Sequence, residues 1–234
     1  MKFSQRSQEK ELLDRDDIPF ADIKKNMEEL NVINTWLGGH KITIQGLKRI
    51  AGNRATTKQP LLILEIGCGG GDNLRAIKNW ARKKKLAFEL LGADINPECI
   101  AYAKGNHHNN EISFVCSDYK TLSFTKKPDI IFSSLFCHHF SNNQLVDQLQ
   151  WMHKHSALGF FINDLQRHPL AYHSIRLLTQ LFSASYLVRN DAPLSVLRSF
   201  TRSDWSSIFE RSGMTNFTCH WKWAFRWLIT LQHA

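Results

Sequence analysis

The segment of the sequence most able to do chemistry is rich in glycine. Residues 64–72 read Leu-Glu-Ile-Gly-Cys-Gly-Gly-Gly-Asp. Glycines allow close approach of backbone to a ligand and tolerate positive φ. The segment lacks the G-x-x-x-x-G-K-[ST] pattern of a phosphate-cradling loop, and it departs from G-x-G-x-x-G because Asp72 stands where the last glycine belongs. An acid at the start of a helix repels a pyrophosphate, which argues against NAD and FAD and leaves an acidic-x-G-x-G-x-G pattern.

Two more acidic markers follow at the ends of apolar segments. Asp94 closes one of them, and its carboxylate can accept both hydroxyls of a ribose. Ser117, Asp118 and Tyr119 follow the next one and suit an adenine amino group with an aromatic ring alongside. Acids after three successive segments suit a ligand with a cationic centre, a ribose and an amino group. S-adenosylmethionine has all three.

The elements that must position these residues alternate between strands and helices. We expect helices over 20–37 and 42–50 before the first strand, and a capping box of Ser141 and Gln144 opening a later helix. The alternation predicts an open α/β sheet with helices on both faces. The expected strands are 61–66, 88–93, 112–116, 128–134 and 157–163, and the expected helices between them are one through Leu74 to Ala81, 97–104 and 142–154.

The last third of the chain departs from this alternation of strands and helices. Pro169 can open a helix, and residues 189–200 are expected to form an ordered loop around the turn residues Asn190, Asp191 and Pro193. A capping box of Thr201 and Asp204 then opens a helix that stops at Gly213, and 217–231 predicts two final strands. The alternating Trp221, Trp223 and Trp227 are expected in the core.

With these motifs the chain resembles the class I S-adenosylmethionine-dependent methyltransferases, in particular the small-molecule type similar to the ubiquinone/menaquinone-biosynthesis group. The resemblance covers residues 58–165 and, more loosely, 199–213. It rests on the glycine motif, on Asp94, on Ser117-Asp118, and on residues 129–140 with the His-containing turn that follows the fourth strand. It implies a Rossmann-like, doubly wound, mostly parallel seven-stranded sheet. It also implies an N-terminal helical cap (1–57), a cofactor-binding core (58–164), a lid or substrate insertion (165–200) and a C-terminal helix with the final strands (201–234).

The resemblance also implies roles for individual residues. Glu65 and the glycines would face the methionine moiety, Asp94 the ribose and Asp118 the adenine, while Ser133 and Ser134 would border the sulfonium. The residues expected to bind S-adenosylmethionine are Glu65, Gly67, Cys68, Gly69, Gly71, Asp94, Ile95, Ser117, Asp118, Tyr119, Ser133 and Ser134.

Histidines supply the candidates for acid–base chemistry. None of the close pairs among the 11 histidines lies in an H-E-x-x-H or carboxylate-flanked pattern, so we expect no metal site. His138 and His139 follow the fourth strand, at the rim where the methyl group should point, and a neutral imidazole there could deprotonate a phenol or enol. His139 is favoured slightly, with Asp164 at the end of the fifth strand as the next candidate. The alternative is that one histidine only caps the next helix.

Composition and charge limit the location and the partners that we expect for this chain. The 234 residues carry a net charge of +9, of which residues 1–34 contribute −2. The apolar runs are too short to span a bilayer, the polar N-terminus lacks a signal-peptide core, and the five scattered cysteines suggest small buried residues in a reducing compartment. We therefore expect a cytoplasmic monomer or homodimer. The basic run 82–85 fits a helix end, which makes nucleic acid an unlikely partner.

Two functions remain open. The first is an enzyme that transfers methyl from S-adenosylmethionine, with S-adenosylhomocysteine as product, to oxygen or carbon of an aromatic, quinone-like or polyketide-like small molecule. The second is a non-catalytic module of the same fold that binds RNA or a protein partner through its basic surface.

Overall fold

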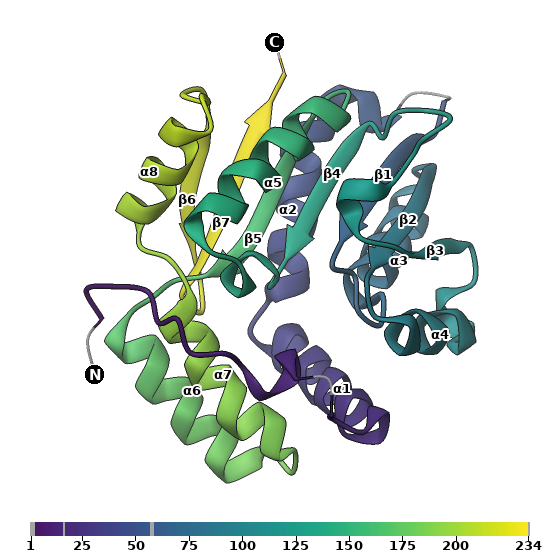
Figure 1. Cartoon of the computed structure of the whole chain (residues 1–234). Helices are drawn as coiled ribbons and strands as arrows, with labels where there is room; N and C mark the ends of the chain where they lie inside the picture. Colours follow the sequence, from purple (N-terminus) through teal and green to yellow (C-terminus); the bar gives the residue numbers. More distant parts are fainter. Residues whose placement is uncertain (1–2, 16, 57–58, 234) are drawn as a thin grey trace.

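The computed structural model describes residues 3–15, 17–56 and 59–233 and contains one seven-stranded sheet in the order β3-β2-β1-β4-β5-β7-β6 (Figure 1). Strands β1 to β5 pair in parallel, whereas β7 is antiparallel to both β5 and β6. This arrangement confirms the expected doubly wound, mostly parallel sheet. The strands are β1 (Leu61–Ile66), β2 (Phe88–Asp94), β3 (Ile112–Cys116), β4 (Ile130–Ser134), β5 (Gly159–Leu165), β6 (Thr218–Lys222) and β7 (Arg226–Gln232).

Helices cover both faces of the sheet, and three more lie beyond the carboxyl ends of its parallel strands. Helices α2, α3 and α4 pack on one face, and α5 and α8 on the other. Helices α1, α6 and α7 lie beyond the sheet edge, where α7 contacts both α1 and α6 (Figure 1). The helices are α1 (Phe20–Trp36), α2 (Gly39–Ala51), α3 (Asp72–Lys84), α4 (Pro97–Gly105), α5 (Asn142–His155), α6 (Pro169–Phe182), α7 (Tyr186–Arg198) and α8 (Arg202–Arg211).

Local sequence signals explain where these elements begin. The Asn96 side chain caps α4 by accepting from the amides of Glu98 and Cys99, and Pro97 occupies the first helical position. The predicted capping boxes form at both expected places, Ser141 with Gln144 and Thr201 with Asp204. β1 is buried along nearly its whole length, as its continuous apolar run predicts for a central parallel strand.

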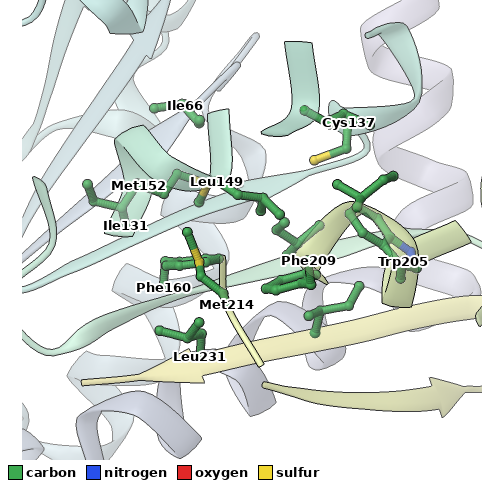
Figure 2. Packing of buried hydrophobic residues seen from close by; sticks show 14 of the residues in the cluster. Ile66, Ile131, Cys137, Leu149, Met152, Phe160, Trp205, Phe209, Met214 and Leu231 are labelled. Carbon is green, nitrogen blue, oxygen red and sulfur yellow. The ribbon is translucent and has the colours of Figure 1, made fainter. Parts of the chain in front are cut away.

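The hydrophobic core has two halves, one on each face of the sheet. Figure 2 shows the half beneath α5 and α8, where Phe209 stacks on Phe160 of β5 and Trp205 packs against Phe209 on its other side. The other half lies under α2, where Gly46 allows the helix to approach Phe161. A Cβ at that glycine would lie 2.4 Å from the Phe161 ring. The two halves fix the sheet, and with it the strand ends that carry the motif residues.

The structure corrects the expectation of a loop at 189–200. These residues belong largely to α7, which contains Pro193 inside the helix. Proline lacks an amide hydrogen and normally breaks a helix, but here tertiary packing prevails, since Leu187, Val188 and Val196 are buried. The turn-like residue types were therefore misleading.

Two smaller expectations were also wrong. Of the three tryptophans assigned to the core, only Trp227 is buried, while Trp221 and Trp223 are 51% and 72% exposed at the β6–β7 hairpin. Cys116 is exposed rather than buried. The expected boundary between cap and core at 57–58 lies outside the described residues. Within the described part of the chain, no helix is both long and apolar enough to cross a membrane.

Candidate active site

The glycine loop between β1 and α3 adopts backbone conformations that favour glycine. Gly67, Gly69 and Gly71 have φ of 68°, 48° and 77°. A Cβ on Gly67 would lie 2.2 Å from the ring of Phe136, so the glycine also leaves the space in which that ring packs against the loop. Above Gly69 the space is open, because an added Cβ would meet only the sulfur of Met27, at 3.8 Å. The loop therefore presents bare backbone to a ligand at Gly69.

Asp94 at the end of β2 holds this loop in place. One carboxylate oxygen accepts from the Gly69 amide at 2.8 Å and the other from the Asn96 amide at 2.9 Å. A carboxylate oxygen has two lone pairs, so each oxygen can still accept a ribose hydroxyl. The neighbouring Ile95 is 72% exposed and offers a flat apolar surface at the same strand end. These features fit a nucleoside.

Glu65 in β1 is the buried acid of the motif. It is 1% exposed, and its Oε1 accepts from the Asn73 side chain at 2.9 Å. Its Oε2 has no partner among the described residues. Burial raises the pKa of Glu65 well above its usual value, and the nearby carboxylates of Asp72 and Asp94 raise it further. An ammonium group such as that of the methionine moiety would satisfy this orphaned oxygen, so the residues present fit S-adenosylmethionine.

The adenine-side residues divide between surface and core. Asp118 caps a short 3-10 turn by accepting from the Lys120 amide, and Ser117 is exposed. The Tyr119 ring is buried against Phe136 and Trp151. Ile95 rather than Tyr119 therefore offers a free apolar surface for a base.

The remaining cofactor candidates lie at the ends of β1 and β4. Ser134 bonds to the Asn163 amide, whereas the Ser133 hydroxyl points to the Cys137 sulfur in the core. Cys68 is buried within the loop. The structure brings Glu65, the glycines, Asp94 and Ser134 to one edge of the sheet and turns Ser133 away from it.

A cavity of about 350 Å³ lies beyond this edge, between α1, α6, α7 and the β6–β7 hairpin. Its wall is mostly apolar and includes Leu30, Ile33, Leu37, Ile175, Leu178 and Val188. It reaches β4 through Leu135, which follows Ser134 and has a φ of 53°, a strained value for a leucine. The size and apolar lining are those of a small-molecule site.

One wall of the cavity is polar. Glu11, His138 and His139 line this wall, while Asp164 and Asp14 contact the two histidines outside the cavity lining, and we call the five side chains the histidine–carboxylate cluster. His138 is 4% exposed, and its Nδ1 bonds to Oδ1 of the fully buried Asp164 at 2.8 Å. His139 bonds through its Nδ1 to Asp14 at 3.0 Å.

Asp164 and Arg198 also hold the turn that carries the two histidines. Asp164 Oδ2 also accepts from the amides of Phe136 and Cys137. Arg198 donates to the carbonyls of His138 and His139 at 3.1 and 2.9 Å. Both rings are thus fixed by contacts to their backbone as well as to their Nδ1 atoms.

Charge is distributed unevenly in the cluster. Burial raises the pKa of Asp164, but the adjacent His138 and the hydrogen bonds from the backbone amides of Leu165 and Cys137 together lower it more, and the net shift is downward, so this carboxylate stays ionised. Burial raises the pKa of Glu11, which is 3% exposed, and His139 and Ser195 only partly offset that effect. The two acids on either side of His138 are therefore different: one is a fixed anion and the other takes up a proton more readily.

Glu11 and Asp14 could not have been found from the sequence. They lie in a polar N-terminal segment that carries no motif, and they reach the cluster because the amides of Leu12 and Leu13 bond to Asp191 of α7 at 2.8 and 2.9 Å. Arg198 was likewise placed in a supposed loop. Only the anchoring of one distant segment to another brings them into the site.

Part of the chain matches a known family of protein domains. Residues 63–159 match the model of a family described as a methyltransferase domain. That range contains the glycine loop, Asp94, Asp118 and both cluster histidines. No curated protein sequence matches the chain significantly.

Solved structures resemble the fold over most of the chain. The plantazolicin methyltransferase BpumL, crystallised with a monoazolic desmethylPZN analogue and S-adenosylhomocysteine, is 21% identical with a TM-score of 0.62, covering 88% of this chain and 77% of its own. Human N-acetylserotonin methyltransferase with S-adenosylmethionine is 16% identical with a TM-score of 0.60, covering 90% and 56%. The methyltransferase domain of the citrinin polyketide synthase is 14% identical with a TM-score of 0.55, covering 74% and 46%. These likenesses confirm the expected fold.

Proposed function

The chain carries a class I, S-adenosylmethionine-dependent methyltransferase domain, and we propose that it methylates a hydroxyl oxygen of an apolar, aromatic or quinol-like small molecule bound in the cavity. When bound, S-adenosylmethionine supplies a methyl group on a sulfonium. Glu65 would bind its ammonium group, Asp94 its ribose and the loop backbone its methionine part.

The cavity adjoins that site and would hold the acceptor beside it. Its wall includes Leu135, directly after the Ser134 at the end of β4, so cavity and cofactor edge meet there. Methyl transfer needs the acceptor oxygen in line with the bond that breaks, and holding both partners supplies much of the rate. The apolar lining from α1, α6 and α7 would fix the acceptor's carbon skeleton and exclude water.

The observation that carries the choice of oxygen is the buried pair of His138 and Asp164, whose histidine lines a mostly apolar cavity. A hydroxyl must lose its proton as the new O–C bond forms. Because Asp164 holds the Nδ1 proton of His138, the Nε2 lone pair is turned toward Glu11 and the cavity. We assign the removal of that proton to the histidine–carboxylate cluster, with Asp164 as the residue that orients His138.

The similar structures favour a small acceptor without identifying it, since one holds a monoazolic desmethylPZN analogue and another is a domain of a citrinin polyketide synthase. A cavity of about 350 Å³ admits a ring system or a short segment of a longer chain. The alternative of a non-catalytic binding module would leave this buried polar wall and the orphaned Glu65 oxygen without a purpose.

The test uses methyl-labelled S-adenosylmethionine and a panel of phenols, quinols, enolic acids, amines and thiols of similar size. We expect label on oxygen of a phenol or quinol, and at least a hundredfold less of it with His138→Gln, whose amide fills a similar space. Label on nitrogen or carbon alone, or a His138→Gln enzyme as active as the wild type, would contradict the proposal. S-adenosylhomocysteine affinity, measured in parallel, shows whether the variant retains its cofactor site.

A further inference from the structure

The inference concerns the space between Glu11, His138 and His139, and it deepens the proposed function by naming what activates the acceptor. Oε1 of Glu11 lies 3.7 Å from Nε2 of His138, and Oε2 lies 3.8 Å from Nε2 of His139. One ligand atom from each of the three residues lies within 4.8 Å of the other two. These separations exceed hydrogen-bond length, so the three side chains converge without bonding to one another.

The spacing suits a small cation. Zinc binds histidine nitrogen and carboxylate oxygen at about 2.0–2.2 Å, which places two ligands of a tetrahedral ion about 3.3 Å apart. The two nitrogen–oxygen distances exceed this value by about half an ångström, and rotation of the side chains would have to bring all three ligand atoms, now within 4.8 Å of one another, around the ion. Two imidazoles and one carboxylate on one side of an ion leave its remaining positions open.

The surroundings prepare both imidazoles as ligands. The Nδ1 of His138 bonds to Asp164 and the Nδ1 of His139 to Asp14. A proton held on each Nδ1 leaves each Nε2 with a free lone pair, which is the form of histidine that coordinates a metal. A carboxylate behind each metal-binding histidine is the usual way in which proteins orient such rings. The histidine and glutamate side chains contribute to the cavity wall, so an open position would face the acceptor.

We propose that Glu11, His138 and His139 bind one divalent transition-metal ion of the zinc class, with an open coordination position directed into the acceptor cavity. Two nitrogen donors out of three disfavour Mg²⁺ and Ca²⁺, which prefer oxygen ligands. An acceptor hydroxyl at the open position would be ionised by the charge of the metal, its proton passing to water, before the oxygen forms its bond to the methyl carbon and the carbon–sulfur bond breaks. Such a site could not be predicted from sequence, because Glu11 is far from the histidines along the chain.

The experiment measures metal binding directly and needs no acceptor. Tag-free protein is stripped with a chelator, titrated with Co²⁺ and then with Zn²⁺, and followed by visible absorption and by metal content after dialysis. We expect about one equivalent of tightly bound Zn²⁺, and a Co²⁺ spectrum whose ligand-field bands indicate nitrogen ligation. Glu11→Gln and His139→Asn should each weaken binding at least tenfold, and Asp164→Asn by about 10–100-fold, since loss of an outer carboxylate has effects of that size.

The matched control is the double variant His107→Asn/His108→Asn. These histidines are also adjacent, but both are exposed and belong to a short 3-10 turn, so the control should bind metal as the wild type does. Absence of saturable Co²⁺ binding, or an equal loss of it in the control, would overturn the proposal. S-adenosylhomocysteine affinity reports the fold of each variant.

The outcome also separates this proposal from the proposed function. If no metal binds but His138→Gln abolishes methyl transfer to oxygen, the metal is refuted and the cluster acts as a protein base. If metal binds and no oxygen acceptor is methylated, the site stands and the proposed function fails.

Discussion

The imidazole of His138 and the carboxylate of Asp164 form a buried pair, joined at 2.8 Å between Nδ1 and Oδ1. Asp164 is the end of a central strand and His138 is in the turn after the neighbouring one, so the pair is assembled by the register of β4 and β5. The same carboxylate accepts two backbone amides of the turn. Asp164 therefore holds the sheet, the turn and the His138 ring together, so a substitution of Asp164 tests how that ring is oriented.

Replacing Asp94 should weaken cofactor binding. Asp94→Ala removes a charged acceptor for the ribose hydroxyls and leaves the Gly69 and Asn96 amides without their partner, so we expect a loss of about 2 kcal/mol or more in S-adenosylhomocysteine affinity. Calorimetry measures it. Glu89→Ala, an exposed acid in the same strand, is the control and should change nothing. Unchanged affinity in a folded Asp94→Ala protein would remove this residue from the site.

Valine substitutions at two glycines of the loop should impair the protein in different ways. Gly69→Val places a branched side chain in open space above the loop and should abolish S-adenosylhomocysteine binding with only a modest loss of stability. Gly67→Val should unfold or strongly destabilise the protein, because even its Cβ would lie 2.2 Å from Phe136. Thermal melting and calorimetry on both variants distinguish the two. Gly105→Ala, where a Cβ meets nothing within 4 Å, is the neutral control.

These variants also show how far sequence analysis could go. The glycine spacing, Asp94 and the strand–helix rhythm are local patterns, and each produced a correct element or placed its residue at the expected edge of the sheet. Cap residues such as Ser141 gave helix starts for the same reason. Local chemistry determined these features, so local sequence was enough to predict them.

Features that depend on contacts between residues far apart in the chain could not be predicted from the sequence. Pro193 suggests a turn, but the helix around it survives because its neighbours are buried. Trp223 was expected in the core and instead forms part of the cavity wall. Glu11 carries no motif, and its position follows from two amide bonds to Asp191. Each of these outcomes was decided by tertiary packing.

The anchoring of the N-terminal segment should matter for turnover. Asp191→Ala frees the amides of Leu12 and Leu13 and so loosens Glu11 and Asp14. We expect turnover to fall by about tenfold to a hundredfold, as small misplacements in an active site do, and residues 3–15 to become more sensitive to protease. Asp147→Ala, which removes an exposed acid of α5, is the comparison. Equal protease sensitivity in the two variants would contradict this anchoring role.

Glu11 and Asp164 should give stability opposite dependences on pH in metal-free protein. The pKa of Asp164 is lowered in the folded state, so the unfolded state binds more protons and stability is lost as pH falls below about 4 through the folded pKa. The pKa of Glu11 is raised by burial, so the folded state holds its proton longer and stability falls as pH rises above about 4.5. Urea unfolding across this range measures the free energy of unfolding at each pH. Relative to wild type, Glu11→Gln should become more stable as pH rises toward neutral, and Asp164→Asn should no longer lose stability as pH falls below about 4. Parallel curves for wild type and both variants would refute these assignments.

The last prediction concerns the two histidines. The sequence slightly favoured His139 as the base, whereas the structure gives His138 the buried carboxylate partner and turns the Nε2 atoms of both rings toward Glu11. If both rings hold a metal, His138→Gln and His139→Asn should each lower turnover by about a hundredfold or more while leaving S-adenosylhomocysteine affinity nearly unchanged, because neither touches the cofactor residues. A large loss for His138→Gln with near-normal turnover for His139→Asn would instead indicate a single protein base held by Asp164. Wild-type turnover in both variants would mean that the polar wall only shapes the cavity and that the acceptor needs no deprotonation.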